Sequence, residues 1–161
     1  MFCFRRLCMS VSIATALTVF TTPASAQSQV TYSLAGVETA ATSTQGTFVG
    51  VGLSADDFAT WAAVIQHEEL DDTASITGGT FALNGGVRDV QGIITDGEIV
   101  RLTSSCRKET FAVTGDVLLV GGGSGEFNVT LTHYGRRVPG GNCVTFFATV
   151  EGLITFTLPA P

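Results

Sequence analysis

The segment VTFFATVEGLITFTL, residues 144–158, decides the fold class of this chain. Its apolar side chains share the even positions: Val144, Phe146, Ala148, Val150, Ile154, Phe156 and Leu158. Threonine and glutamate occupy odd positions, and this alternation predicts a β-strand with its even face in the core. As one straight strand the segment would extend about 50 Å at ~3.3 Å per residue. We therefore expect this strand to bend, and we expect the bend at Gly152, where glycine makes bending the backbone least costly.

The same period of two recurs along the chain, between turn residues spaced eight to twelve positions apart, which is typical of an all-β protein. Strands are expected at 30–36, 46–53, 58–67, 73–83, 87–95, 98–105, 109–120, 125–134 and 143–158. A sheet with one apolar face per strand must close on itself or form two layers. We expect an antiparallel meander of about eight to nine strands that closes as a small β-barrel, with a two-layer β-sandwich as the alternative.

Three local signals refine this pattern. Asp96-Gly97 predicts a two-residue hairpin turn, and Asn84-Gly85 predicts another. The apolar parity flips across Gly78-Gly79, which predicts a β-bulge. Residues 54–70 fit either a strand or a helix capped by Ser54, and we favour the strand.

The first 26 residues have the organisation of a secretory signal peptide. Two arginines precede an apolar run at 7–20, and Ala24-Ser25-Ala26 forms a cleavage site. The apolar run is shorter than the ~20 residues of a membrane span. We expect a single all-β domain at 27–161, secreted or periplasmic, with no membrane span after cleavage.

The charge balance argues against some partners. Only 14% of residues are charged, and removing Arg5 and Arg6 changes the formal net charge from −6 to −8. Nucleic acids and anionic membranes are bound through basic surfaces, so a protein with this overall charge is not expected to be a general binder of either.

The cysteines predict one disulfide. Cys3 and Cys8 leave with the signal peptide, and Cys106 and Cys143 then enter an oxidising compartment as a pair. In the nine-strand meander their strand ends would lie about 14 Å apart at ~4.8 Å per strand. A disulfide tolerates only about 7 Å between Cα atoms. One strand end must fold inward across a barrel mouth, or the two strands must face each other in a sandwich.

This disulfide would gather positive charge at one end of the protein. Arg107 and Lys108 adjoin Cys106, and Arg136 and Arg137 precede Cys143. His133 and Tyr134 border the same loop and complete the six candidate ligand-binding residues. Arginine pairs well with carboxylate and phosphate groups, so the candidate ligand is a small anion.

Other motifs do not specify a reaction. The glycine-rich run at 121–125 opens a strand and lacks the lysine of a phosphate-binding loop. The acidic run at 68–72 has no calcium-loop spacing. His67 and His133 both lie on inward parities, a pattern that suits rim histidines better than a metal site. Asn128 begins a glycosylation sequon that matters only in a eukaryotic host. We predict no catalytic residue, metal or cofactor.

Three functional hypotheses remain. The first is a domain that binds a small ligand, a glycan or an envelope protein without catalysis. The second is a β-barrel enzyme of the isomerase, cyclase or hydrolase type, which a buried acid–base pair beside a deep pocket would favour. The third is a structural or adhesive subunit that uses exposed strand edges.

Overall fold

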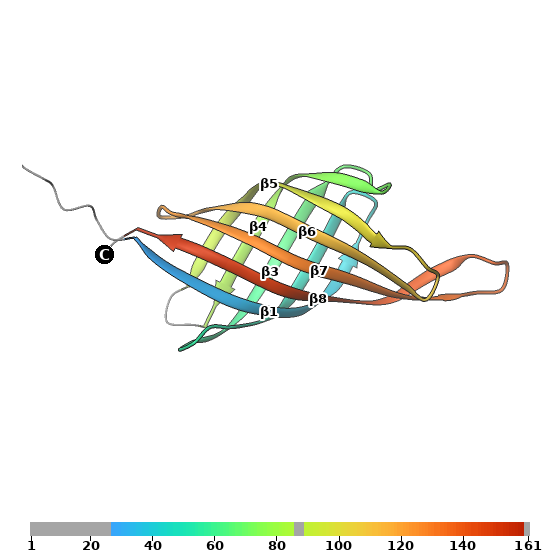
Figure 1. Ribbon diagram of the computed structural model, residues 1–161, viewed down its shortest axis with the longest axis horizontal. Coiled ribbons are helices and arrows are strands. Elements are labelled where there is room, and N and C mark those ends of the chain that lie inside the picture. Colours follow the sequence, from blue (N-terminus) through green and yellow to red (C-terminus); the bar gives the residue numbers. More distant parts are fainter. Residues whose placement is uncertain (1–26, 86–88, 160–161) are drawn as a thin grey trace, which may run out of the picture.

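The computed structural model describes residues 27–85 and 89–159, and the predicted signal peptide lies outside this range. Eight strands follow one another: β1 (Ser28–Ala41), β2 (Gln45–Leu53), β3 (Phe58–His67), β4 (Thr73–Asn84), β5 (Val90–Thr103), β6 (Lys108–Leu119), β7 (Ser124–Arg137) and β8 (Cys143–Leu158). Each strand pairs antiparallel with the next, and β8 pairs with β1 (Figure 1). The expected closed barrel is therefore confirmed, and the sandwich alternative is wrong.

Residues 58–67 form β3, so the strand interpretation of this segment is confirmed. The described residues contain no helix of the length and apolar character that crossing a membrane requires.

The hairpin predicted at Asp96-Gly97 is wrong, because both residues lie inside the continuous strand β5. Asp96 pairs with Asp116 and Gly97 with Gly115, and the register shifts between Ile94 and Asp96. A Cβ atom at position 97 would lie 2.2 Å from the carbonyl oxygen of Thr114. Gly97 is therefore needed where the backbones of β5 and β6 approach closely, and not for a turn. Because residues 90–103 form one strand, the barrel has eight strands instead of nine.

The bulge predicted at Gly78-Gly79 is confirmed. Gln66 pairs with Gly78 and His67 with Ile76, so one residue of β4 has no partner in this ladder. The extra residue restores the inward parity, and Ile76 and Phe81 are both buried.

The bend predicted at Gly152 is not a break in pairing, because the register continues through this residue on both sides. The shift in β8 lies instead opposite the step from Tyr134 to Gly135, at Phe146. Phe146 and Val144 are 66% and 47% exposed. Phe146 is the extra residue of this shift, and Val144 pairs with the outward-facing Arg136, so the even positions are core only from Ala148 onward. The long strand fits the small domain because its first residues project beyond the barrel (Figure 1).

The core fills the barrel axis with one apolar face from every strand. Its most deeply buried large side chains are Phe111, Phe156, Leu83, Ile94, Ile154 and Val117. Trp61 is also buried, and its Nε1 atom donates to the carbonyl oxygen of Val51 at 3.0 Å.

The connections alternate between the two ends of the barrel. We call the end that carries loops 42–44, 68–72, 104–107 and 138–142 the disulfide end. Loop 54–57, the β6–β7 turn at 120–123, and the start of β1 and end of β8 lie at the opposite end.

Candidate functional site

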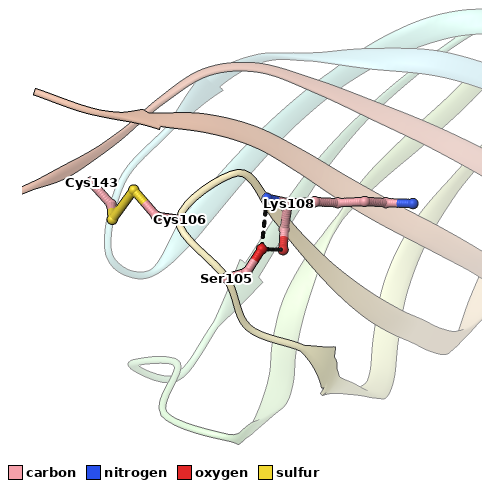
Figure 2. Close-up of a disulfide and its surroundings, with 4 residues drawn as sticks. All are labelled: Ser105, Cys106, Lys108 and Cys143. Carbon is pink, nitrogen blue, oxygen red and sulfur yellow. Dashed lines mark hydrogen bonds between the residues drawn. A yellow bond between two sulfur atoms is a disulfide. The ribbon is translucent and has the colours of Figure 1, made fainter.

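The predicted disulfide between Cys106 and Cys143 is present, with 5.3 Å between the Cα atoms (Figure 2). Loop 104–107 reaches Cys143 by crossing β7 at Gly135. The Gly135 N–H donates to the Arg107 carbonyl at 3.1 Å, and a Cβ atom on Gly135 would lie 2.6 Å from the Cys106 carbonyl oxygen. Position 135 shares the inward parity of Leu131 and His133, so the loop folds inward across the barrel mouth. This is one of the two arrangements expected from the sequence.

Beside this crossing, the disulfide end holds a pocket of about 220 Å³, which we call the mouth pocket. Its polar wall consists of Glu38, His67, Glu69 and His133. Loops 42–44 and 68–72 contribute to its rim through Thr42, Ser43 and Leu70. The described lining contains two carboxylates and neither lysine nor arginine.

The floor of the mouth pocket is apolar. Phe48, Ile65, Val113 and Leu131 line it and also line a cavity of about 40 Å³ on the barrel axis. Trp61 is part of the wall of that inner cavity. A ligand in the mouth pocket would therefore meet carboxylate and imidazole groups at the rim and hydrocarbon below.

A carboxylate and an imidazole meet in the wall of the mouth pocket. The Nε2 atom of His133 on β7 lies 3.0 Å from the Oε2 atom of Glu38 on β1. Their side chains are 20% and 9% exposed. The rings of His133 and Phe111 form a T-shaped contact, with 5.3 Å between ring centroids.

A second polar group lies on the neighbouring strands of the same end. Arg101 on β5 forms two ion pairs. Its Nε atom lies 3.0 Å from Oε1 of Glu109, and its Nη1 atom lies 3.1 Å from Oδ1 of Asp72. Its guanidinium carbon lies 5.9 Å from the centre of the Phe111 ring, a cation–π distance. Phe111 therefore contacts both the Arg101 guanidinium and the His133 imidazole.

The six residues predicted as ligand-binding all lie at the disulfide end, but only His133 lines the mouth pocket. Arg107, Lys108, Arg136 and Arg137 are exposed. Tyr134 lies on the outer face of β7, where its ring stacks on Phe147 with 6.1 Å between centroids. Figure 2 shows the side chain of Lys108 pointing away from the disulfide, while its backbone is held by Ser105 Oγ. The anion site stays a prediction, and it would lie outside the mouth pocket.

Glu38 is a site residue that the sequence reasoning missed. The expected first strand ended at residue 36, whereas β1 continues to Ala41. The signal was present, because Tyr32, Leu34 and Gly36 share the even parity that places Glu38 on the inner face. A charged residue at a position where the alternation predicts an inward side chain is the signal that could have identified Glu38.

His67 and His133 both line the mouth pocket, as their inward parities predicted. The Nδ1 atom of His67 lies 2.6 Å from the Glu68 carbonyl oxygen, within hydrogen-bond distance. Within the described ranges, no set of three or more histidine, cysteine, aspartate and glutamate side chains is arranged to hold a metal ion.

The opposite end holds another buried polar contact. The hydroxyl of Tyr32 donates to Oδ2 of Asp57 at 2.6 Å, beside a pocket of about 280 Å³. Burial raises the pKa of Tyr32 to about 12, and the hydrogen bond to the Asp57 carboxylate and its charge act in the same direction. Tyr32 is therefore a protonated donor at neutral pH and serves to hold loop 54–57 against the barrel.

Comparison of the chain with protein-family models, curated proteins and solved structures found no match.

Proposed function

We propose that this protein is a binding domain that takes up a small ligand in the mouth pocket without catalysis. The observation that carries the proposal is the composition of that pocket, which has an apolar floor below a rim of carboxylate and imidazole groups. Ligand sites are typically concave and mostly apolar, with a few polar groups that fix orientation. At about 220 Å³ the pocket is smaller than the range of about 300–1,000 Å³ typical of drug-sized ligands, so the ligand is small.

The charges of the rim indicate the polar group of the ligand. Glu38 and Glu69 contribute carboxylates, which accept hydrogen bonds and attract cations. A short alkyl or aryl amine therefore suits the pocket better than a carboxylic acid of the same size. Any small anion would bind instead at the exposed arginines outside the pocket.

Trp61 provides a direct test, because it is the only tryptophan of the chain and lines the inner cavity. Short alkyl amines, alcohols and carboxylates of matched chain length are titrated while Trp61 emission is recorded. We expect saturable changes with amines tightest. Glu38→Gln should lower amine affinity by about 10- to 150-fold, since a charged partner is worth about 1.5–3 kcal/mol. Glu151→Gln, which removes an equal charge from the outer wall, is the matched control. Equal affinity for all three compounds, unaffected by Glu38→Gln, would contradict the proposal.

A second candidate is a β-barrel enzyme that moves a proton, and the contact between Glu38 and His133 in the pocket wall favours it. A carboxylate that orients an imidazole is a common arrangement for general acid–base catalysis. The two functions are separated by incubating a bound ligand in D₂O and following its carbon-bound protons by NMR. Exchange that is lost in His133→Gln supports an enzyme, whereas binding without exchange supports the binding domain.

The third hypothesis, a structural or adhesive subunit, required free strand edges. Within the described residues β1 pairs with β8 and closes the barrel, so no observation favours this hypothesis.

We further propose that the chain acts as a single domain at 27–161 after export to a secreted or periplasmic location. The Cys106–Cys143 disulfide is consistent with an oxidising compartment. The mass of exported protein tests this proposal, since cleavage after Ala26 leaves a chain that begins at Gln27. Retention of Met1 in exported material would contradict it.

A further inference from the structure

The β7–β8 hairpin projects past the other loops of the disulfide end (Figure 1). We call its residues 134–147, together with Arg107 and Lys108 of the disulfide-linked loop, the tip. The tip combines exposed aromatic rings with unpaired positive charge, which is unusual in a chain of net charge −6. We propose that the tip docks the barrel onto the surface of an anionic lipid bilayer.

The first support is the exposed apolar surface of the tip. Phe146 is 66% exposed, and Phe147 and Val144 are each 47% exposed. Phe147 and Val144 face outward beside Tyr134 and Arg136, and the described structure leaves all three side chains largely uncovered. Large apolar side chains gathered at a protruding end mark an interaction site, and aromatic rings suit the headgroup region of a bilayer.

The second support is the charge. Arg107, Lys108, Arg136 and Arg137 are exposed and make up four of the eight basic residues of the chain. Among the described residues, no carboxylate forms an ion pair with any of these four. Each basic residue near an anionic leaflet strengthens binding by about fivefold. Four such charges on one projection therefore supply a strong local attraction.

The third support is the order of these side chains on one face. Lys108, Tyr134 and Phe147 are direct partners across β6, β7 and β8. Arg136 and Val144 pair in the next outward-facing row. Directly paired residues present their side chains to the same side of a sheet, so aromatic and cationic groups alternate on the outer face of the tip. This mixture matches a surface where anionic headgroups lie beside hydrocarbon.

Other occupants fit these observations less well. A small soluble anion would use the arginines but leave Phe146 and Phe147 exposed. A second copy of the tip would oppose four positive charges with four more. The acidic remainder of the barrel repels an anionic surface, but the projection separates the two, and repulsion decays over about 10 Å at 0.1 M salt. The mouth pocket opens at the same end, so docking brings its entrance near the bilayer.

The test uses oxidised chain 27–161 and co-flotation with vesicles of phosphatidylcholine, with or without phosphatidylglycerol. We expect binding to the anionic vesicles that weakens with added salt and is at least about tenfold weaker without phosphatidylglycerol. Arg136→Gln/Arg137→Gln should reduce binding by roughly 25-fold, about fivefold for each lost charge, and Phe146→Ser should separately reduce it by roughly tenfold. Phe146→Trp should shift its emission to the blue on vesicle addition, which reports insertion independently of affinity.

Two matched controls isolate the tip. Gln29→Glu/Gln91→Glu lowers the net charge by the same two units away from the tip, and Leu153→Ser removes a side chain that is 50% exposed on the barrel wall. Both should change vesicle binding by less than about twofold. The proposal is overturned by absence of binding, by binding that the tip variants leave unchanged, or by equally tight binding of soluble glycerol phosphate with no effect of Phe146→Ser.

Discussion

Glu38 and His133 are brought to within 3.0 Å although they lie on β1 and β7, strands that are not neighbours in the barrel. The strand between them, β8, pairs with both. The contact therefore depends on closure of the barrel and forms part of the wall of the mouth pocket. Substitutions at Glu38 or His133 should therefore affect both the free energy of unfolding and the properties of the mouth pocket.

A double-mutant cycle on Glu38→Gln and His133→Gln should show this coupling in the free energy of unfolding. We expect an interaction energy of about 1–2 kcal/mol, since each single substitution removes one of two neighbouring polar groups that are mostly buried. Urea unfolding of the wild type, both single variants and the double variant measures it. Glu38→Gln combined with Glu126→Gln on the outer wall should be additive, and additivity of the first pair as well would contradict the contact.

The contact between Tyr32 and Asp57 predicts a loss of stability in alkali. The pKa of Tyr32 is raised from 10.0 to about 12, so the folded protein holds this proton more tightly than the unfolded chain. The stabilisation is complete below pH 10 and is lost as pH rises to 12, for a total of about 3 kcal/mol. Urea unfolding across this range should show the slope in Tyr134→Phe but not in Tyr32→Phe. An identical slope in both variants would assign the effect to other groups.

Three carboxylates face one another on the outer wall and predict a stabilising substitution. Asp116 lies directly opposite Asp96 on β5 and Glu126 on β7. Like charges in such cross-strand positions are destabilising. Asp116→Asn should raise the free energy of unfolding by about 0.5–1 kcal/mol at low salt, with a smaller gain at high salt. Glu151→Gln, whose partners are Ala35 and Thr130, should change it little.

The disulfide should contribute substantially to stability because its two cysteines are 37 positions apart. Cys106→Ser/Cys143→Ser should lower the free energy of unfolding by about 2–4 kcal/mol, mainly through the entropy of the unfolded chain. Thermal unfolding with and without reductant checks this for the wild type, and the double variant should not respond to reductant. Equal stability of the reduced and oxidised wild type would show that the crosslink is energetically neutral.

Local patterns in the sequence were sufficient for the secondary structure and for much of the topology. Alternation along 144–158 reports which side chains a strand places on each face, and this depends only on backbone geometry. The bulge at Gly78-Gly79 was visible because an inserted residue inverts that parity. The pairing of Cys106 with Cys143 followed from there being two cysteines in the domain.

The tertiary structure decided features that depend on neighbouring strands. Asp96-Gly97 has the residues of a tight turn, yet β5 pairs with β4 on both sides of this step, and Asp96 and Gly97 themselves pair with β6. These pairings outweigh the local preference. Phe146 has the parity of a core residue, but it lies beyond the end of the barrel. Whether an inward position meets a core depends on strand length relative to the barrel, which alternation does not encode.

The candidate site divides in the same way. His133 could be recognised from its parity, and the four basic residues of the tip from their proximity to the cysteines. The mouth pocket and the contact between Glu38 and His133 could not, because they arise when β1 closes against β8 and brings distant residues together. The sequence determined which face each side chain takes, and closure of the barrel decided which faces meet.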